Sequence, residues 1–132
     1  MALVLKYKER PEILVTLRKG DAEVTLPGYV DSGSDITYVP FQIARTLGLR
    51  MRSQKEPLNT GGGHKMDVVK ASLDLIVCDE DLRKAYVFKD TRVFVPTRAR
   101  DDELLLGREG FFDKFKVTIN EKAKEIILER AE

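Results

Sequence analysis

Val30-Asp31-Ser32-Gly33-Ser34-Asp35 places an acidic residue directly after a short apolar stretch and follows it with small side chains. Gly33 has no Cβ, so a ligand or another backbone can approach it closely, and the Ser32 hydroxyl can donate to a carbonyl or a carboxylate. Asp, Ser and Gly are also favoured in ordinary β-turns. The segment alone therefore fits both a plain turn and an acid held beside a cavity.

Short strands are expected on both sides of this segment. Before it, Lys19-Gly20-Asp21 has the composition of a hairpin turn, and Pro27-Gly28 predicts a break ahead of Tyr29-Val30. After it, Pro40 suits a first helical turn and Gly48 suits a helix end. The expected strands are 3–8, 13–17, 22–26, 29–30, 51–58, 66–78, 85–88, 92–95, 115–119 and 125–128, with helices at 40–49 and 107–114. This pattern predicts a mostly β domain with one or two short helices.

The composition of the 132-residue chain predicts one folded domain, residues 1–132. Its 23 Lys and Arg against 22 Asp and Glu leave a net charge of +1, which argues against a nucleic-acid binder that neutralises phosphates. Cys78 is the only cysteine, which excludes an internal disulfide and a cysteine-based zinc site. The apolar start is too short for a signal sequence, and no apolar run approaches the roughly 18 residues of a membrane span. We therefore expect a cytoplasmic protein that binds neither membranes nor nucleic acid.

Two further segments follow Asp31 in an informative order. The glycines of Thr60-Gly61-Gly62-Gly63-His64 begin 30 residues after Asp31 (61 − 31), and Leu105-Leu106-Gly107-Arg108-Glu109 lies near the C-terminus. This combination resembles the retropepsin-like (retroviral-type) family of aspartic proteases, including its cellular and prokaryotic members, over about residues 15–128. The resemblance implies a closed, single-lobed acid-protease β-barrel.

The resemblance also implies that Asp31 is the catalytic acid. Two carboxylates roughly 3 Å apart cannot both ionise, so they share one proton. The ionised carboxylate takes a proton from the attacking water, and the protonated one stabilises the oxyanion. Only one Asp-Ser/Thr-Gly segment occurs in the chain, so a two-fold homodimer has to complete the pair. We expect an aspartic endopeptidase that cuts extended polypeptides at acidic to mildly acidic pH, with no cofactor and no metal.

Supporting roles follow from the same resemblance. Ser32 would hydrogen-bond across the two-fold axis, and Gly33 would complete the active-site loop. Residues Gly61, Gly62 and Gly63 would form the tip of a flap over the substrate, although a plain flexible loop explains these glycines as well. Asp35 and Arg108 would form an ion pair in a partly buried place, tying the active-site loop to the C-terminal segment.

Two other interpretations stay open at this point. The chain could be a non-catalytic module of the same fold that dimerises or binds peptides, or an unrelated small β-barrel in which Asp31 lies in a surface turn. The apolar ends, 3–8 and 126–128, either interleave with those of a second subunit or pair within one chain. Arg45, Arg50, Arg52 and Lys55 form a local basic cluster, which a solvated face explains.

Overall fold

The structure, a computed structural model, describes residues 1–51, 54–59, 65–100 and 102–132. Within these residues the chain is mostly β with one short helix, as the sequence predicts. The elements are β1 (Ala2–Lys6), β2 (Glu12–Lys19), β3 (Ala22–Val30), α1 (Phe41–Leu47), β4 (Glu56–Asn59), β5 (Lys65–Cys78), β6 (Ala85–Pro96), β7 (Leu104–Leu106), β8 (Phe115–Asn120) and β9 (Glu125–Arg130). The helix has seven residues, and no helix in the described part of the chain is long and apolar enough to cross a bilayer.

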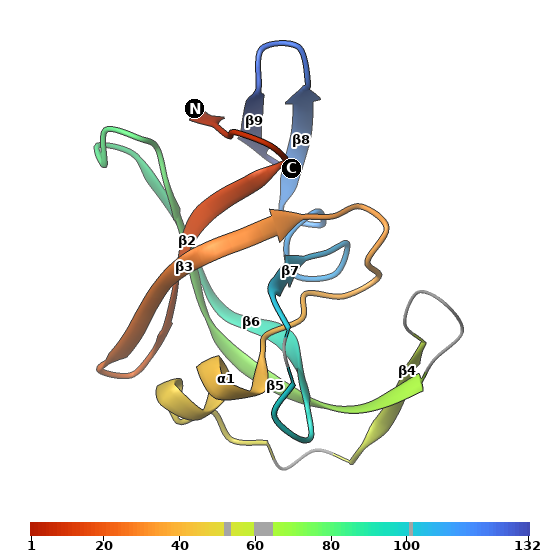
Figure 1. Ribbon diagram of the computed structural model, residues 1–132. Helices are drawn as coiled ribbons and strands as arrows, with labels where there is room; N and C mark the ends of the chain where they lie inside the picture. Colours follow the sequence, from red (N-terminus) through yellow and green to blue (C-terminus); the bar gives the residue numbers. More distant parts are fainter. Residues whose placement is uncertain (52–53, 60–64, 101) are drawn as a thin grey trace.

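The strands form two sheets (Figure 1). The larger sheet has six strands in the order β4-β5-β2-β3-β7, with β6 paired to β5, and the smaller sheet has the order β1-β9-β8. The expected closed barrel is therefore wrong for the strands that the structure describes. The physical reason is that the β8–β9 hairpin takes β1 as its third strand, so the chain leaves the larger sheet after β7 instead of closing it.

The two ends of the chain pair with each other in one molecule. Strands β1 and β9 are antiparallel, with Leu3 opposite Leu128 and Leu5 opposite Ile126. Leu3, Ile126 and Leu128 are fully buried, so this pairing carries part of the core. Of the two arrangements left open by the sequence, the structure has the one within a single chain.

Helix α1 begins and ends where its flanking residues predict. Pro40 precedes its first residue, and Gly48 ends it at a left-handed φ of 68° while donating its N–H to the carbonyl of Arg45. The second expected helix, 107–114, is wrong: this segment forms successive turns. Gly110 has a φ of 102°, which an α-helix cannot contain, and the Phe112 N–H reaches back five residues to the carbonyl of Gly107.

Strand β3 runs unbroken through the Pro27-Gly28 pair, contrary to the expected break. Its last three residues pair in parallel with β7, from Gly28 opposite Leu104 to Val30 opposite Leu106. A Cβ on Gly28 would lie 2.9 Å from a methyl carbon of Leu106. The glycine therefore lets β7 pack closely against β3 at the place where Asp31 follows.

The strands expected at 85–88 and 92–95 are also one strand, β6, which crosses an irregularity in its pairing with β5. The expected strand 51–58 begins later, at Glu56, in the residues that the structure describes.

A main apolar core joins both sheets and α1. A second, smaller core of Ile36, Tyr38, Val68 and Phe94 lies next to the end of β7 and borders the candidate site.

Candidate functional site

Asp31 directly follows the last residue of β3, and β7 fixes its backbone. Its N–H donates to the carbonyl of Leu106 at 3.0 Å, which continues the parallel pairing of the two strands by one residue. One carboxylate oxygen, Oδ1, accepts the Gly33 N–H at 2.9 Å, and the Asp31 carbonyl accepts the Ser34 N–H at 3.1 Å. Asp31-Ser32-Gly33 is thus a turn, but one that holds a half-buried carboxylate at the end of a strand.

The loop after this turn is bound to the segment that follows β7. The carbonyl of Ser34 accepts the Arg108 N–H at 2.8 Å, and the carbonyl of Asp35 accepts the Glu109 N–H at 3.0 Å. A Cβ on Gly107 would lie 2.0 Å from the carbonyl oxygen of Ile36, so only glycine fits there. The loop position is therefore set by backbone contacts that leave little room for movement.

Thr37, which the sequence did not single out, links the chain after the Asp31 loop to the segment after β7 through its buried side chain. It is 1% exposed. Its hydroxyl donates to the carbonyl of Glu109 at 2.8 Å and accepts the Gly107 N–H at 3.3 Å. A Thr next to apolar residues gives no local sign of this role, which depends on contacts some 70 residues away in the sequence.

The chain after the loop returns along the opposite side of β7. Tyr38 and Leu105 exchange two backbone hydrogen bonds, of 2.9 and 3.0 Å, while Phe94 of β6 donates to the carbonyl of Thr37 at 2.9 Å. Strand β7 therefore lies between β3 on one side and residues 36–38 on the other. The residues before and after Asp31 are both hydrogen-bonded into the sheet, which makes the loop between them a rigid support.

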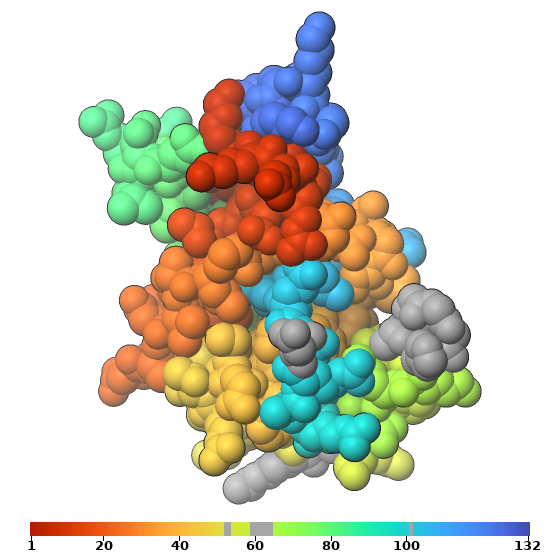
Figure 2. All heavy atoms as spheres, viewed as in Figure 1, coloured from red at the N-terminus to blue at the C-terminus, as the bar shows by residue number. Residues whose placement is uncertain are grey.

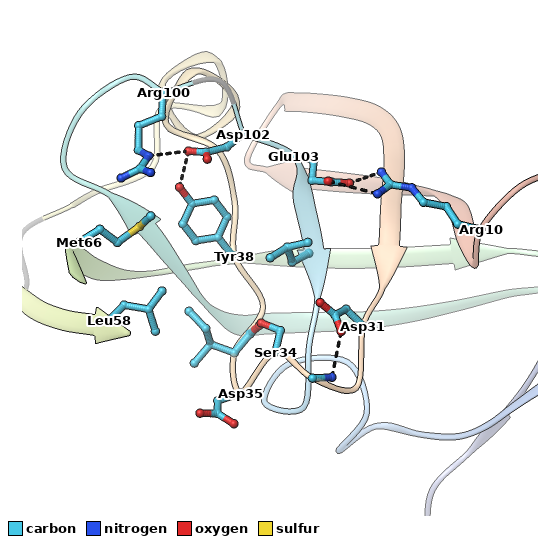
Figure 3. A pocket seen from close by; sticks show the side chains of 13 residues that line it. Arg10, Asp31, Ser34, Asp35, Tyr38, Leu58, Met66, Arg100, Asp102 and Glu103 are labelled. Carbon is cyan, nitrogen blue, oxygen red and sulfur yellow. Dashed lines mark hydrogen bonds and ion pairs between the residues drawn. The ribbon is translucent and has the colours of Figure 1, made fainter. Parts of the chain in front are cut away.

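Asp31 lines a cavity of about 610 Å³ (Figure 3). The apolar part of its wall comes from Ile36, Leu105, Leu58 and Met66. Leu58 and Met66 are opposite each other in the β4–β5 hairpin, so this hairpin forms the side of the cavity that faces the Asp31 loop. The shape and the lining suit an extended chain with apolar side chains.

Charged residues of the cavity wall are paired with one another. Arg10 donates from both terminal nitrogens to the carboxylate of Glu103. The Tyr38 hydroxyl donates to Oδ2 of Asp102 at 2.5 Å, and Nε of Arg100 lies 3.5 Å from the same oxygen. No role was predicted from the sequence for Tyr38, Arg100, Asp102 or Glu103. The run of acidic residues just before Leu104 was the available signal.

The Tyr38–Asp102 hydrogen bond predicts a loss of stability at alkaline pH. Burial, and then the hydrogen bond to Asp102, raises the pKa of Tyr38 well above its usual range. Above about pH 10 an unfolded chain loses this proton while the folded chain keeps it, so the free energy of unfolding falls as the pH rises. We expect the stability difference between the wild type and Tyr38→Phe to shrink progressively as the pH rises above about 10. Urea unfolding at each pH measures it, and a constant difference would contradict the burial of a hydrogen-bonded hydroxyl.

The other predicted site residues differ in their exposure and in their partners. Ser32 is exposed, and within the described ranges its hydroxyl has no hydrogen-bond partner. Asp35 Oδ1 lies 3.6 Å from Nη1 of Arg108, as the expected pair requires, but the two side chains are 82% and 68% exposed instead of partly buried. The predicted flap glycines, 61–63, lie outside the described residues. In the part of the chain that the structure covers, no three His, Cys, Asp or Glu side chains gather as a metal site.

Comparison with solved structures finds chains of similar fold, among them a retroviral protease. The EIAV protease complexed with the inhibitor HBY-793 is similar over 76% of this chain and 84% of its own chain, at 19% sequence identity and with a TM-score of 0.47. No family model matches the sequence, and no curated protein matches it. A shared activity does not follow at this level, so the chemistry has to be argued from the residues of this chain.

Proposed function

We propose that the chain is a retropepsin-like aspartic endopeptidase whose active site forms when two copies place their Asp31 carboxylates together. The observation that supports this most is the carboxylate itself. Asp31 is half-buried and lines a cavity of about 610 Å³. Its carboxylate accepts the Gly33 N–H, and its backbone N–H donates to the carbonyl of Leu106 in β7.

The acid that completes the pair has to come from outside the chain. Among the described residues, three other carboxylates line the cavity, and each is already bound to an arginine: Asp35 to Arg108, Asp102 to Arg100, and Glu103 to Arg10. A carboxylate neutralised by an arginine is a poor partner for sharing a proton. A second copy of Asp31, related by a two-fold axis, supplies an equivalent group without a new site.

The geometry of Asp31 suits such a pair. Its Oδ1 is oriented by the Gly33 N–H, and within the described residues Oδ2 has no hydrogen-bond partner. Oδ2 is therefore free to share a proton with its symmetry mate. One carboxylate then accepts a proton from the attacking water, while the other donates to the oxygen of the scissile carbonyl. The Ser32 hydroxyl, which has no hydrogen-bond partner among the described residues, is available for a hydrogen bond across the axis.

The substrate in this proposal is an extended polypeptide. Such a chain would lie between the Asp31 loop and the β4–β5 hairpin, where it could form backbone hydrogen bonds as an added strand. Its apolar side chains would contact Ile36, Leu58 and Leu105. The same apolar wall would serve a peptide-binding module without catalysis, which is the second candidate function.

Digestion of an unfolded protein at several pH values tests the proposal. We expect cleavage at acidic to mildly acidic pH, because the pair has to keep one proton, and inhibition by a statine-type peptide. Activity per molecule should rise with protein concentration in the range where ultracentrifugation detects dimers. A stable dimer that binds peptides but cuts none of them at any pH would instead support the binding module.

A further inference from the structure

A second cavity, of about 390 Å³, adjoins the first and shares Met66 and Arg100 with it. Among the described residues, its charged lining consists of four cations, Lys55, Lys65, Arg98 and Arg100, and one carboxylate, Asp67. In Figure 3, Arg100 and Met66 lie on the opposite side of the first cavity from Asp31. A peptide that extends from Asp31 across the first cavity therefore meets this group of cations, here called the basic cavity.

The cations of the basic cavity come from three separate segments. Lys55 precedes β4, Lys65 begins β5, and the two arginines belong to the connection after β6. Figure 2 shows that connection, in cyan, on the same face as the start of β5, in yellow-green. In the sequence, Lys55 belongs to a local basic cluster that a solvated face explains. The fold instead places it with cations that are distant in the sequence, in a chain whose net charge is only +1.

Most of this positive charge is not neutralised by the residues that the structure describes. Within the described residues, Lys55, Lys65 and Arg98 form no ion pair, and only Arg100 has one, with Asp102 at 3.5 Å. The backbone beneath these side chains is fixed, because the Thr97 N–H donates to the carbonyl of Asp67 at 3.2 Å. Arg100 is further oriented through Asp102 by the buried Tyr38 hydroxyl. Like charges held close together repel, and an anion bound among them relieves that repulsion.

We propose that the basic cavity binds acidic side chains of the polypeptide that lies in the Asp31 cavity, so that the enzyme prefers substrates with Glu or Asp a few residues from the cut. The inference rests on the proposed function and adds a substrate preference to it. Arginine binds carboxylates through two parallel hydrogen bonds, which suits a single acidic side chain. A nucleic acid fits less well, because it needs an extended basic surface and the chain has almost no basic excess.

Paired peptides test this preference. A peptide that the wild-type enzyme cuts is made in versions with Glu at each successive position on either side of the cut, each matched by Gln at the same position. We expect Glu to improve cleavage over Gln by roughly fivefold at one or two positions and to have no effect at the others. The improvement should weaken as salt is added.

Two charge reversals locate the effect. Arg98→Glu should abolish the preference for Glu and favour Lys at the same positions, so that the ratio of the Glu to the Gln cleavage rate falls to one or below. Lys122→Glu, an equal charge change at the exposed β8–β9 turn, should leave the Glu preference as in the wild type. Equal rates for all Glu and Gln peptides, or the same response in both variants, would overturn the inference.

A binding measurement separates this inference from the proposed function. The Asp31→Asn variant should bind the labelled Glu peptide more tightly than the Gln peptide, as measured by fluorescence anisotropy, whether or not the wild type cuts either. If the wild type cuts both peptides equally and the variant binds them equally, the protease stands and the basic cavity has no such role. Displacement of the Glu peptide by a short single-stranded oligonucleotide at lower concentration than by the unlabelled Glu peptide would overturn the inference in favour of a nucleic-acid site.

Discussion

The Asp31→Asn variant is expected to lose peptide cleavage by roughly 10³-fold or more while keeping the fold and the dimer of the wild type. An amide cannot ionise, so the pair of side chains at the axis can neither share a proton nor take one from water. The Asn side chain has the same shape and still offers an oxygen to the Gly33 N–H, which donates to Oδ1 of Asp31 at 2.9 Å. Initial rates on one peptide, with circular dichroism and ultracentrifugation of both proteins, measure the separate effects.

The matched control is Asp21→Asn, which makes the same chemical change in the exposed turn between β2 and β3. It should cleave as the wild type does at every pH. If Asp31→Asn cleaved at the wild-type rate, Asp31 would have no part in the reaction. If it unfolded, the hydrogen bonds around Asp31 would depend on charge more than the geometry indicates, and an Asp31→Glu variant would be the next test of the activity.

Gly107→Ala is expected to have the largest effect on stability, a loss of about 3 kcal/mol or more in the free energy of unfolding. The added Cβ would lie 2.0 Å from the carbonyl oxygen of Ile36 and 2.7 Å from that of Ser34. Both contacts are with backbone, which cannot turn aside as a side chain can. The Asp31 loop would have to separate from the segment after β7, so cleavage should fall together with stability. Urea unfolding and peptide cleavage of the same preparation measure the two effects.

Gly20→Ala is the control for the substitution itself. Gly20 has a φ of 59°, and no atom lies within 4 Å of an added Cβ, so its cost is only the left-handed backbone strain of about 1 kcal/mol. The difference between the losses of unfolding free energy in the two variants gives the cost of the close backbone contact at Gly107. Equal losses of stability would mean that the two segments do not approach each other as closely as described.

Local features of the fold could be predicted from the sequence. Helix α1 follows from Pro40, its apolar face and Gly48, all within one short segment. The 107–114 helix was wrong because Gly110, with a φ of 102°, adopts a conformation that no α-helix contains. The closed barrel was wrong because strand pairing is decided between distant segments, as when β9 pairs with β1.

The residues of the candidate site also fall into those that the local sequence marks and those that only contacts between distant segments bring together. Asp31, Asp35 and Arg108 were singled out because their neighbours in the sequence mark them. Thr37, Tyr38 and Asp102 were missed, because the roles of their side chains arise from contacts between segments; 64 residues separate Tyr38 from Asp102. No local pattern encodes such a contact.

The proposal depends most directly on one acid being contributed by each of two molecules, and mixing subunits measures this. Wild-type protein is exchanged with increasing amounts of Asp31→Asn protein at constant total concentration, and cleavage is expressed per wild-type subunit. If the hybrid dimers are inactive, this value falls in proportion to the wild-type fraction, to about half in an equal mixture. A value that stays constant throughout the mixing series would show that each chain carries a complete site of its own and would contradict the shared pair.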